Sequence, residues 1–171
     1  MGAIAILGTG PSLAEYKGGF DRTIGVNDIW RYCEVDDLVV LNKQSSFGHD
    51  RLAVIQRSKP KVFWSQIVQW DLMPGFRKIE FYPGYPEKFC RLGPLLFERS
   101  YCSPFVAAQI AYKYYGGTEI HLFGVDMTNH PLLTGTLLPR VQNHFRNLDK
   151  ALKEKGSCLV IHGKGILADI L

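Results

Sequence analysis

Short hydrophobic runs alternate along this chain with segments whose hydrophobic positions repeat at helical spacing. Six of the runs are mostly hydrophobic and predict strands at residues 4–7, 23–26, 38–41, 61–64, 119–123 and 158–161. Continuous hydrophobic character is typical of strands in a parallel sheet that is covered on both faces. The pattern therefore predicts a buried, mainly parallel sheet of about six strands.

Three segments between these runs predict helices, at residues 49–58, 103–115 and 139–155. The last is the clearest, because its hydrophobic residues repeat at spacings of four, three and four. These residues are Val141, Phe145, Leu148 and Leu152. Alternating strands and helices predict an α/β fold: a Rossmann-like, doubly wound sheet with helices on both faces.

Residues that favour helix ends support two of these helices. Ser103 can cap the second helix, and Pro104 suits its first turn. Glycines at 116 and 117 end that helix, and Gly156 ends the third.

Residues 65–99 interrupt this alternation. They are rich in proline and aromatic residues and predict an irregular excursion, with a hairpin around residues 79–82 as one option. Such excursions overhang the binding crevice in α/β enzymes or simply pack on the surface. The length of 171 residues is that of one domain, so residues 1–171 are predicted to form a single domain.

Composition and charge exclude several classes of protein. Hydrophobic residues make up 46% of the chain and charged residues 21%, which is ordinary for a globular protein. A net charge of +4 would help to attract a phosphorylated small molecule, but it falls short of the dense basic patch of a nucleic-acid-binding protein. The one locally basic cluster, Lys150, Lys153 and Lys155, is predicted to mark the solvated end of a helix.

Targeting and metal-binding signals are missing from the sequence. No hydrophobic run approaches the roughly 20 residues that a membrane helix needs, so we predict no transmembrane segment. Residues 1–7 have no basic region before them, which indicates a core strand and not a signal peptide. The cysteines form no C-x-x-C pair, and we expect reduced thiols, no bound metal and a cytoplasmic location. They are Cys33, Cys90, Cys102 and Cys158.

A glycine-containing turn follows the first predicted strand. It consists of Gly8, Thr9, Gly10, Pro11 and Ser12. Ligands of open α/β sheets bind beyond the carboxyl ends of the strands, where free backbone amides can hold an anion and Ser12 can cap the next helix. The turn is neither the G-x-G-x-x-G fingerprint nor a Walker loop. It predicts a nucleotide or nucleotide-sugar site, with a plain structural turn as an equally open alternative.

Polar residues also end three other predicted strands. Asn27 and Asn42 end the second and third strands, and their amides offer a donor and an acceptor to a ribose hydroxyl or a base edge. Either residue alone would more often be a turn former. Asp126 follows the fifth strand and could be a general base, a metal ligand or an acceptor for loop amides.

The last predicted helix carries His144 and Asn147 on one face. A histidine near the start of a helix, facing the sheet edge, can serve as a general base at neutral pH. The alternative is a capped or partly buried histidine without a catalytic role.

Taken in order, these motifs resemble the bacterial sialyltransferases of glycosyltransferase family 42, and more loosely the wider set of proteins with a G-x-G-P-S-L turn. Residues 7–13 look like the opening G-N-G-P-S-L of the family, and residues 103–111 look like its S-G-V-x-M-x-A-V-A-I-A helix. Residues 119–126 are similar to its E-I-Y-L-x-G-I-D, and residues 144–149 to its H-x-x-N-x-D.

The resemblance implies an inverting, metal-independent glycosyltransferase that takes a nucleotide-sugar donor, most simply a CMP-sugar, and a glycan acceptor. It implies that His144 deprotonates the acceptor and that residues 8–12 and Ser103 hold ribose and phosphate. Asn27 and Asn42 would hold the nucleoside, and Asn147 and Asp149 would orient the helix and the ring. No cofactor is implied, and because family members often assemble as tetramers, a homo-oligomer is open.

The chain departs from the family pattern at several positions. Thr9 replaces an asparagine beside the nucleotide, and the two tyrosines that support the leaving phosphate after Asp126 are absent. Thr128, His130 or Arg140 could take their part. Two other functions stay open: a Mg²⁺-dependent pterin diphosphokinase-like phosphoryl transferase, in which Asp28 or Asp36 would assist Asp126, and a non-catalytic nucleotide-binding module.

Overall fold

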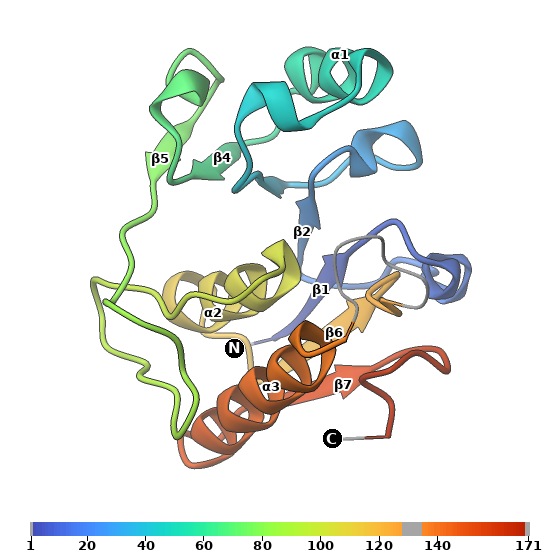
Figure 1. Ribbon diagram of the computed structural model, residues 1–171. Coiled ribbons are helices and arrows are strands. Elements are labelled where there is room, and N and C mark those ends of the chain that lie inside the picture. The colour runs from blue at the N-terminus through green and yellow to red at the C-terminus, as the bar shows by residue number, and fades with distance from the viewer. Residues whose placement is uncertain (1, 128–134, 170–171) are drawn as a thin grey trace.

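The computed structural model in Figure 1 describes residues 2–127 and 135–169. In these residues, seven parallel strands form one sheet in the order β5-β4-β3-β2-β1-β6-β7. The strands are β1 Ala3–Leu7, β2 Arg22–Val26, β3 Asp37–Val39, β4 Val62–Ser65, β5 Phe76–Lys78, β6 Glu119–Phe123 and β7 Cys158–Ile161. The chain runs outward from β1 to β5 and returns to add β6 and β7 on the other side of β1. The predicted Rossmann-like α/β fold is confirmed, and its switch point lies between β1 and β6.

Helices cover both faces of the sheet unequally. The α-helices are α1 His49–Arg57, α2 Ser103–Tyr115 and α3 Leu137–Lys153, and short 3₁₀-helices are η1 Pro11–Glu15, η2 Ile29–Arg31, η3 Gln44–Ser46 and η4 Val68–Trp70. Residues Ile4 and Ile6 of β1 pack in one hydrophobic cluster with α2 and α3. Ala5 and Leu7 point to the opposite face and pack with residues from α1, η2 and η4. The two long helices therefore share one face, as Figure 1 shows, and α1 with the 3₁₀-helices covers the other.

The seventh strand, β5, was not predicted. It has one hydrophobic residue, Phe76, followed by two exposed basic residues, so no strand pattern marks it. Pairing with β4 defines it, through the register of Phe63 with Phe76. The third predicted strand also ends earlier than expected, because β3 stops at Val39.

The excursion forms no hairpin at residues 79–82. It makes an isolated parallel bridge instead, in which the Tyr82 amide donates to the Phe97 carbonyl and the Phe97 amide donates to the Glu80 carbonyl, both at 2.9 Å. A fully buried glutamine of α2, Gln109, then accepts from the Glu98 amide at 2.8 Å and donates to the Glu98 carbonyl at 3.0 Å. The excursion, drawn in green in Figure 1, is thereby fixed to α2.

None of the helices formed by residues 2–127 and 135–169 combines the length and the apolar character that a membrane span requires.

Candidate functional site

The turn after β1 is bound to the loop after β6, at the switch point of the sheet. The Gly8 amide donates to the Phe123 carbonyl and the Gly10 amide to the Gly124 carbonyl, both at 2.8 Å. The Ser12 amide donates to Asp126 Oδ2 at 3.0 Å. These three amides are already paired and cannot form the free anion cradle that the sequence suggested. Pro11 has no N–H, and the amide of the exposed Thr9 has no hydrogen-bond partner among residues 2–127 and 135–169.

Ser12 connects two loops and does not cap a helix. Its hydroxyl donates to Asp126 Oδ2 at 2.8 Å and accepts from the Gly124 amide at 2.8 Å. Ser12 lies inside η1, where Gly10 occupies the N-cap position and no side chain caps the helix. The predicted capping role is therefore wrong, and both Ser12 and Asp126 are buried parts of a joint between β1 and β6.

The turn after β7 packs against the same joint. A Cβ atom added at Gly163 would lie 2.4 Å from Ser12 Cβ and 2.7 Å from Asp126 Oδ1. The Ile166 amide donates to the Asp126 carbonyl at 3.1 Å. Loops from β1, β6 and β7 thus meet at Asp126, which acts as an acceptor for loop groups. The described part of the chain contains no cluster of three His, Cys, Asp or Glu residues that could hold a metal ion.

Replacing Gly10 with alanine should disrupt this joint. The added Cβ would lie 2.5 Å from Asp126 Oδ2 and 2.8 Å from the Gly124 carbonyl oxygen. We expect a loss of about 1–3 kcal/mol in the free energy of unfolding, measured by urea denaturation, because the backbone must shift to admit the methyl group. Gly48→Ala is the matched control, since a Cβ there meets nothing within 4 Å. Equal stability of the two variants would contradict the expectation.

Asn27 follows β2 directly and lies next to the turn. Leu7 pairs with Gly25, so Asn27 stands two residues beyond this pair, as Thr9 does on the neighbouring strand. Its backbone has φ of +53°, a left-handed conformation that asparagine tolerates better than most residues. Its side-chain oxygen Oδ1 is buried and has no hydrogen-bond partner among the described residues. Such an oxygen is available to a donor group on a ligand.

Asn42 does not occupy the equivalent position. Because β3 stops at Val39, Asn42 lies three residues beyond the strand, and its side chain is exposed. Its carbonyl accepts a hydrogen bond from Trp70 Nε1 at 2.9 Å, which fixes the backbone there. The two asparagines therefore differ in setting, although the sequence placed both at strand ends.

Ser103 is the first residue of α2 and is buried. Cys102 occupies the N-cap position, and no side chain makes a capping hydrogen bond, so the predicted cap is wrong. The helix nonetheless begins and ends where the sequence predicted, with Pro104 in its first turn and Gly116 left-handed at its end.

His144 lies in the middle of α3 and not near its start, and its side chain is 0% exposed. Its Nδ1 atom is 3.0 Å from Ser100 Oγ, and its Nε2 atom is 3.5 Å from Glu87 Oε1, beyond hydrogen-bond geometry. Burial lowers the pKa of His144, and the neighbouring Glu87 carboxylate partly opposes this effect. The imidazole is therefore neutral at pH 7 and can accept a proton.

Residues 85–87, which we call the strap, cover His144. The rings of Tyr85 and Tyr101 stack with centroids 4.7 Å apart, and both lie nearly parallel to the imidazole at 5.8 and 6.0 Å. Arg140 pairs with the Glu87 carboxylate and lies over both tyrosine rings. The strap thus covers the Nε2 atom of His144, which has no hydrogen-bond partner among the described residues.

The polar face of α3 holds the strap in place. Asn147 Nδ2 donates to the Pro86 carbonyl at 2.7 Å, and Asn143 Nδ2 donates to the Glu87 carbonyl at 2.8 Å. The resemblance implied that Asn147 and Asp149 orient the helix and the ring. Among the described residues neither forms a hydrogen bond with the imidazole, and Asp149 accepts from the Leu159 amide at 3.1 Å. Thr128 and His130 lie outside the described residues.

The sequence reasoning did not identify Glu87 or Ser100, although both lie at the ring nitrogens of His144. Glu87 is 43% exposed and sits in the proline-rich excursion, and no local pattern marks either residue. Only the path of the excursion over α3 brings them to the histidine.

No known family model matches this sequence, and none of the curated proteins matches it. Its fold resembles that of a bacterial sialyltransferase. Sialyltransferase CstII from Campylobacter jejuni, in complex with the substrate analogue CMP-3FNeuAc, gives a TM-score of 0.61 at 14% identity, over 100% of this chain and 84% of that chain. A point mutant of α-2,3/8-sialyltransferase CstII gives 0.60 at 15% identity, over 99% and 85%. At this identity the likeness establishes a sialyltransferase-like fold.

Proposed function

We propose that this protein is a CMP-sugar-dependent, inverting glycosyltransferase, similar to sialyltransferases, that acts on a glycan acceptor. The observation that carries the proposal is Asn27: its buried, unpaired Oδ1 lies beside the turn after β1, at the carboxyl edge of the sheet. The fold as a whole supports it, because the similar transferase binds a CMP-sugar analogue.

The donor would bind where Thr9 and Asn27 lie. A buried acceptor without a partner costs about 1–3 kcal/mol, and a ligand N–H or O–H that pairs with it recovers that cost. Cytosine and ribose both carry such donors. Thr9, in the turn after the neighbouring strand β1, contributes an amide without a partner among the described residues and a hydroxyl, both available to the phosphate. Ser103, Asn42 and Thr128 belong to the proposed site through the resemblance to the family.

His144 is the proposed general base. Its neutral imidazole would take the proton of the acceptor hydroxyl at Nε2, while the acceptor oxygen bonds to the anomeric carbon of the donor. The bond from that carbon to the phosphate oxygen breaks in the same displacement, so CMP leaves and the configuration inverts. Because the strap covers Nε2, residues 85–87 must move when the acceptor enters.

The phosphoryl-transfer alternative needs carboxylates grouped for Mg²⁺. Asp28 is paired with Arg51 at 2.7 Å, and Asp36 with Lys61 at 2.7 Å. Neither pairing places these groups with Asp126. A non-catalytic nucleotide-binding module is the other alternative. In such a protein the strap would stay closed over His144. Activity measured with and without EDTA separates the phosphoryl transferase from the proposed glycosyltransferase, because a Mg²⁺-dependent enzyme would stop and the proposed transferase would not.

Binding of CMP tests the donor half of the proposal. We expect CMP at 100 times its dissociation constant to stabilise the fold by about 2.7 kcal/mol in a thermal-shift experiment. UMP, GDP and ATP should give smaller shifts. Asn27→Ala should weaken CMP binding by about tenfold, the effect of one lost hydrogen bond to a buried group. Failure of every nucleotide to shift the melting temperature would overturn the proposal.

A further inference from the structure

A pocket of about 440 Å³ lies at the opposite edge of the sheet from the proposed donor site. Thr118 and Ser157 line it, just before β6 and β7 begin, whereas Asp126 follows the end of β6. Five residues of strand separate the two edges, which is more than ~15 Å at about 3.3 Å per residue. The pocket is therefore not part of the donor site.

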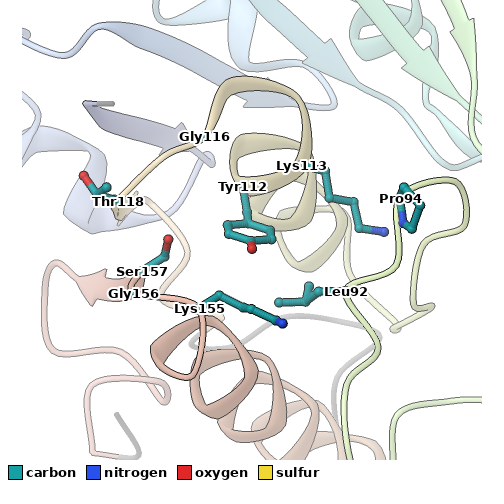
Figure 2. Close-up of a pocket in the computed structure, with 9 residues that line it drawn as sticks. All are labelled: Leu92, Pro94, Tyr112, Lys113, Gly116, Thr118, Lys155, Gly156 and Ser157. Atoms are coloured by element: carbon teal, nitrogen blue, oxygen red, sulfur yellow. The ribbon is translucent and has the colours of Figure 1, made fainter.

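The walls of this pocket come from three segments. The last turn of α2 contributes Tyr112 and Lys113, the turn after α3 contributes Lys155, and the excursion contributes Leu92 and Pro94. Figure 2 shows both lysine side chains extending toward the loop that carries Leu92 and Pro94. A volume of this size accommodates an organic molecule with a ring.

The charge of the lining is positive. Two lysines line the pocket, and among the described residues no carboxylate does. The carboxyl ends of α2 and α3 also lie here, and part of their carbonyl groups is paired: the Tyr112 carbonyl accepts from the Gly116 amide and the Leu152 carbonyl from the Ser157 amide. An anion is thus the ligand that this lining favours.

Lys113 is held in position for such a ligand. Its amine donates to the Leu96 carbonyl and lies 4.3 Å from the centroid of the Phe97 ring. Burial lowers the pKa of Lys113 to about 8, although the neighbouring Cys90 and Glu98 act to raise it. The ammonium is therefore incompletely compensated by the protein, and an anion beside it would favour its charged form.

Several polar groups of the lining have no partner within the described residues. They are the Lys155 amine and the hydroxyls of Tyr112, Thr118 and Ser157. Ser157 is also buried, so it lies within the wall of the pocket and not on the open surface. Leu92, Pro94 and the Tyr112 ring add an apolar side to the same pocket.

We propose that this pocket is a second ligand site, which binds a small organic oxyanion: a phosphate or carboxylate group attached to a ring or another apolar part. The oxyanion lies between Lys113 and Lys155, and the apolar part lies against Leu92, Pro94 and Tyr112. This site is independent of the proposed donor site.

NMR titration of the ¹⁵N-labelled protein with phenyl phosphate and with phenylacetate tests the proposal, with phenol as the uncharged control. We expect saturable shifts at the amides of Gly116, Gly117 and Gly156 with one or both anions, and none with phenol. The stronger anion identifies the head group. Shifts scattered over the surface, equal shifts with phenol, or no saturation would overturn the proposal.

Matched variants test the two amines. Lys113→Met and Lys155→Met should each weaken binding by about tenfold or more, as expected for a lost charge-assisted hydrogen bond. Lys113→Arg should retain binding. Lys150→Met makes the same charge change at an exposed position of α3 outside the pocket, and it should have no effect. Equal losses in all three methionine variants would refute the site.

The same titration of the Asn27→Ala variant separates this site from the donor site. Shifts at Gly116 and Gly156 equal to those of the wild type are expected, because Asn27 follows the far end of β2. Loss of the shifts in this variant would show one shared site and overturn the proposal.

Discussion

Replacing Asp37 with alanine should lower the free energy of unfolding by about 3–5 kcal/mol, the cost of removing one partner from a buried ion pair. Asp37 begins β3, and its side chain is 0% exposed. Its Oδ1 accepts from Arg22 Nε at 3.1 Å and from Arg22 Nη2 at 2.6 Å. Its Oδ2 accepts from Trp64 Nε1 at 2.9 Å and from the Tyr115 hydroxyl.

One carboxylate thus joins β2, β3, β4 and the end of α2. Burial and the Asp37 carboxylate raise the pKa of Tyr115, so its hydroxyl stays protonated and remains a donor. The Arg22 guanidinium also lies 4.0 Å above the Tyr115 ring. Without Asp37, the Arg22 guanidinium, the Trp64 indole N–H and the Tyr115 hydroxyl would all lose this acceptor. A buried donor without an acceptor destabilises the folded state.

Urea denaturation of Asp37→Ala and Asp37→Asn measures this effect. The asparagine variant keeps one oxygen acceptor and should lose less stability than the alanine variant. Asp50→Ala is the control, because the Asp50 side chain is 92% exposed, and it should stay within about 0.5 kcal/mol of the wild type. A loss of less than about 1 kcal/mol in Asp37→Ala would mean that the network contributes no more than an ordinary surface pair.

The fold was largely predictable because its elements carry strong local signals. The bounds of α2, β6 and β7 match the predicted ranges, and the α3 stripe of Val141, Phe145, Leu148 and Leu152 is buried as expected. Hydrophobic periodicity depends on neighbours along the chain, so it can be recognised without knowing which elements pack together. β5 escaped prediction because pairing with β4, and not its own sequence, makes it a strand.

The candidate site was less predictable, since its contacts join segments far apart in the sequence. The turn after β1 has the glycines of an anion cradle, but β6 and the loop that follows it occupy its amides and its serine. Which amides remain free depends on that loop and not on the turn itself. His144 was recognisable as a candidate base, whereas its cover by Tyr85 and Glu87 follows from a long irregular excursion.

His144→Ala should lower the turnover of a CMP-sugar by about 10²–10⁴-fold, the usual contribution of a general base. Because the ring is fully buried and stacks on Tyr85 and Tyr101, the variant also leaves a cavity and should lose stability. Turnover of this variant is therefore compared at a temperature where its folded fraction is verified by circular dichroism. His49→Ala is the control, since the His49 side chain is 98% exposed.

The pH dependence of turnover distinguishes a base from a packing residue. Burial lowers the pKa of His144 below its ordinary value of 6.5, so the neutral, proton-accepting form should persist at pH 7 and turnover should fall only at more acidic pH. Glu87 acts to raise that pKa, so Glu87→Gln should move the acid fall of turnover to still lower pH. It should also lower the KM for the acceptor, because the strap then loses its ion pair with Arg140. If His144 were only a packing residue, Glu87→Gln would leave the pH profile unchanged, and that outcome would remove His144 from the proposed mechanism.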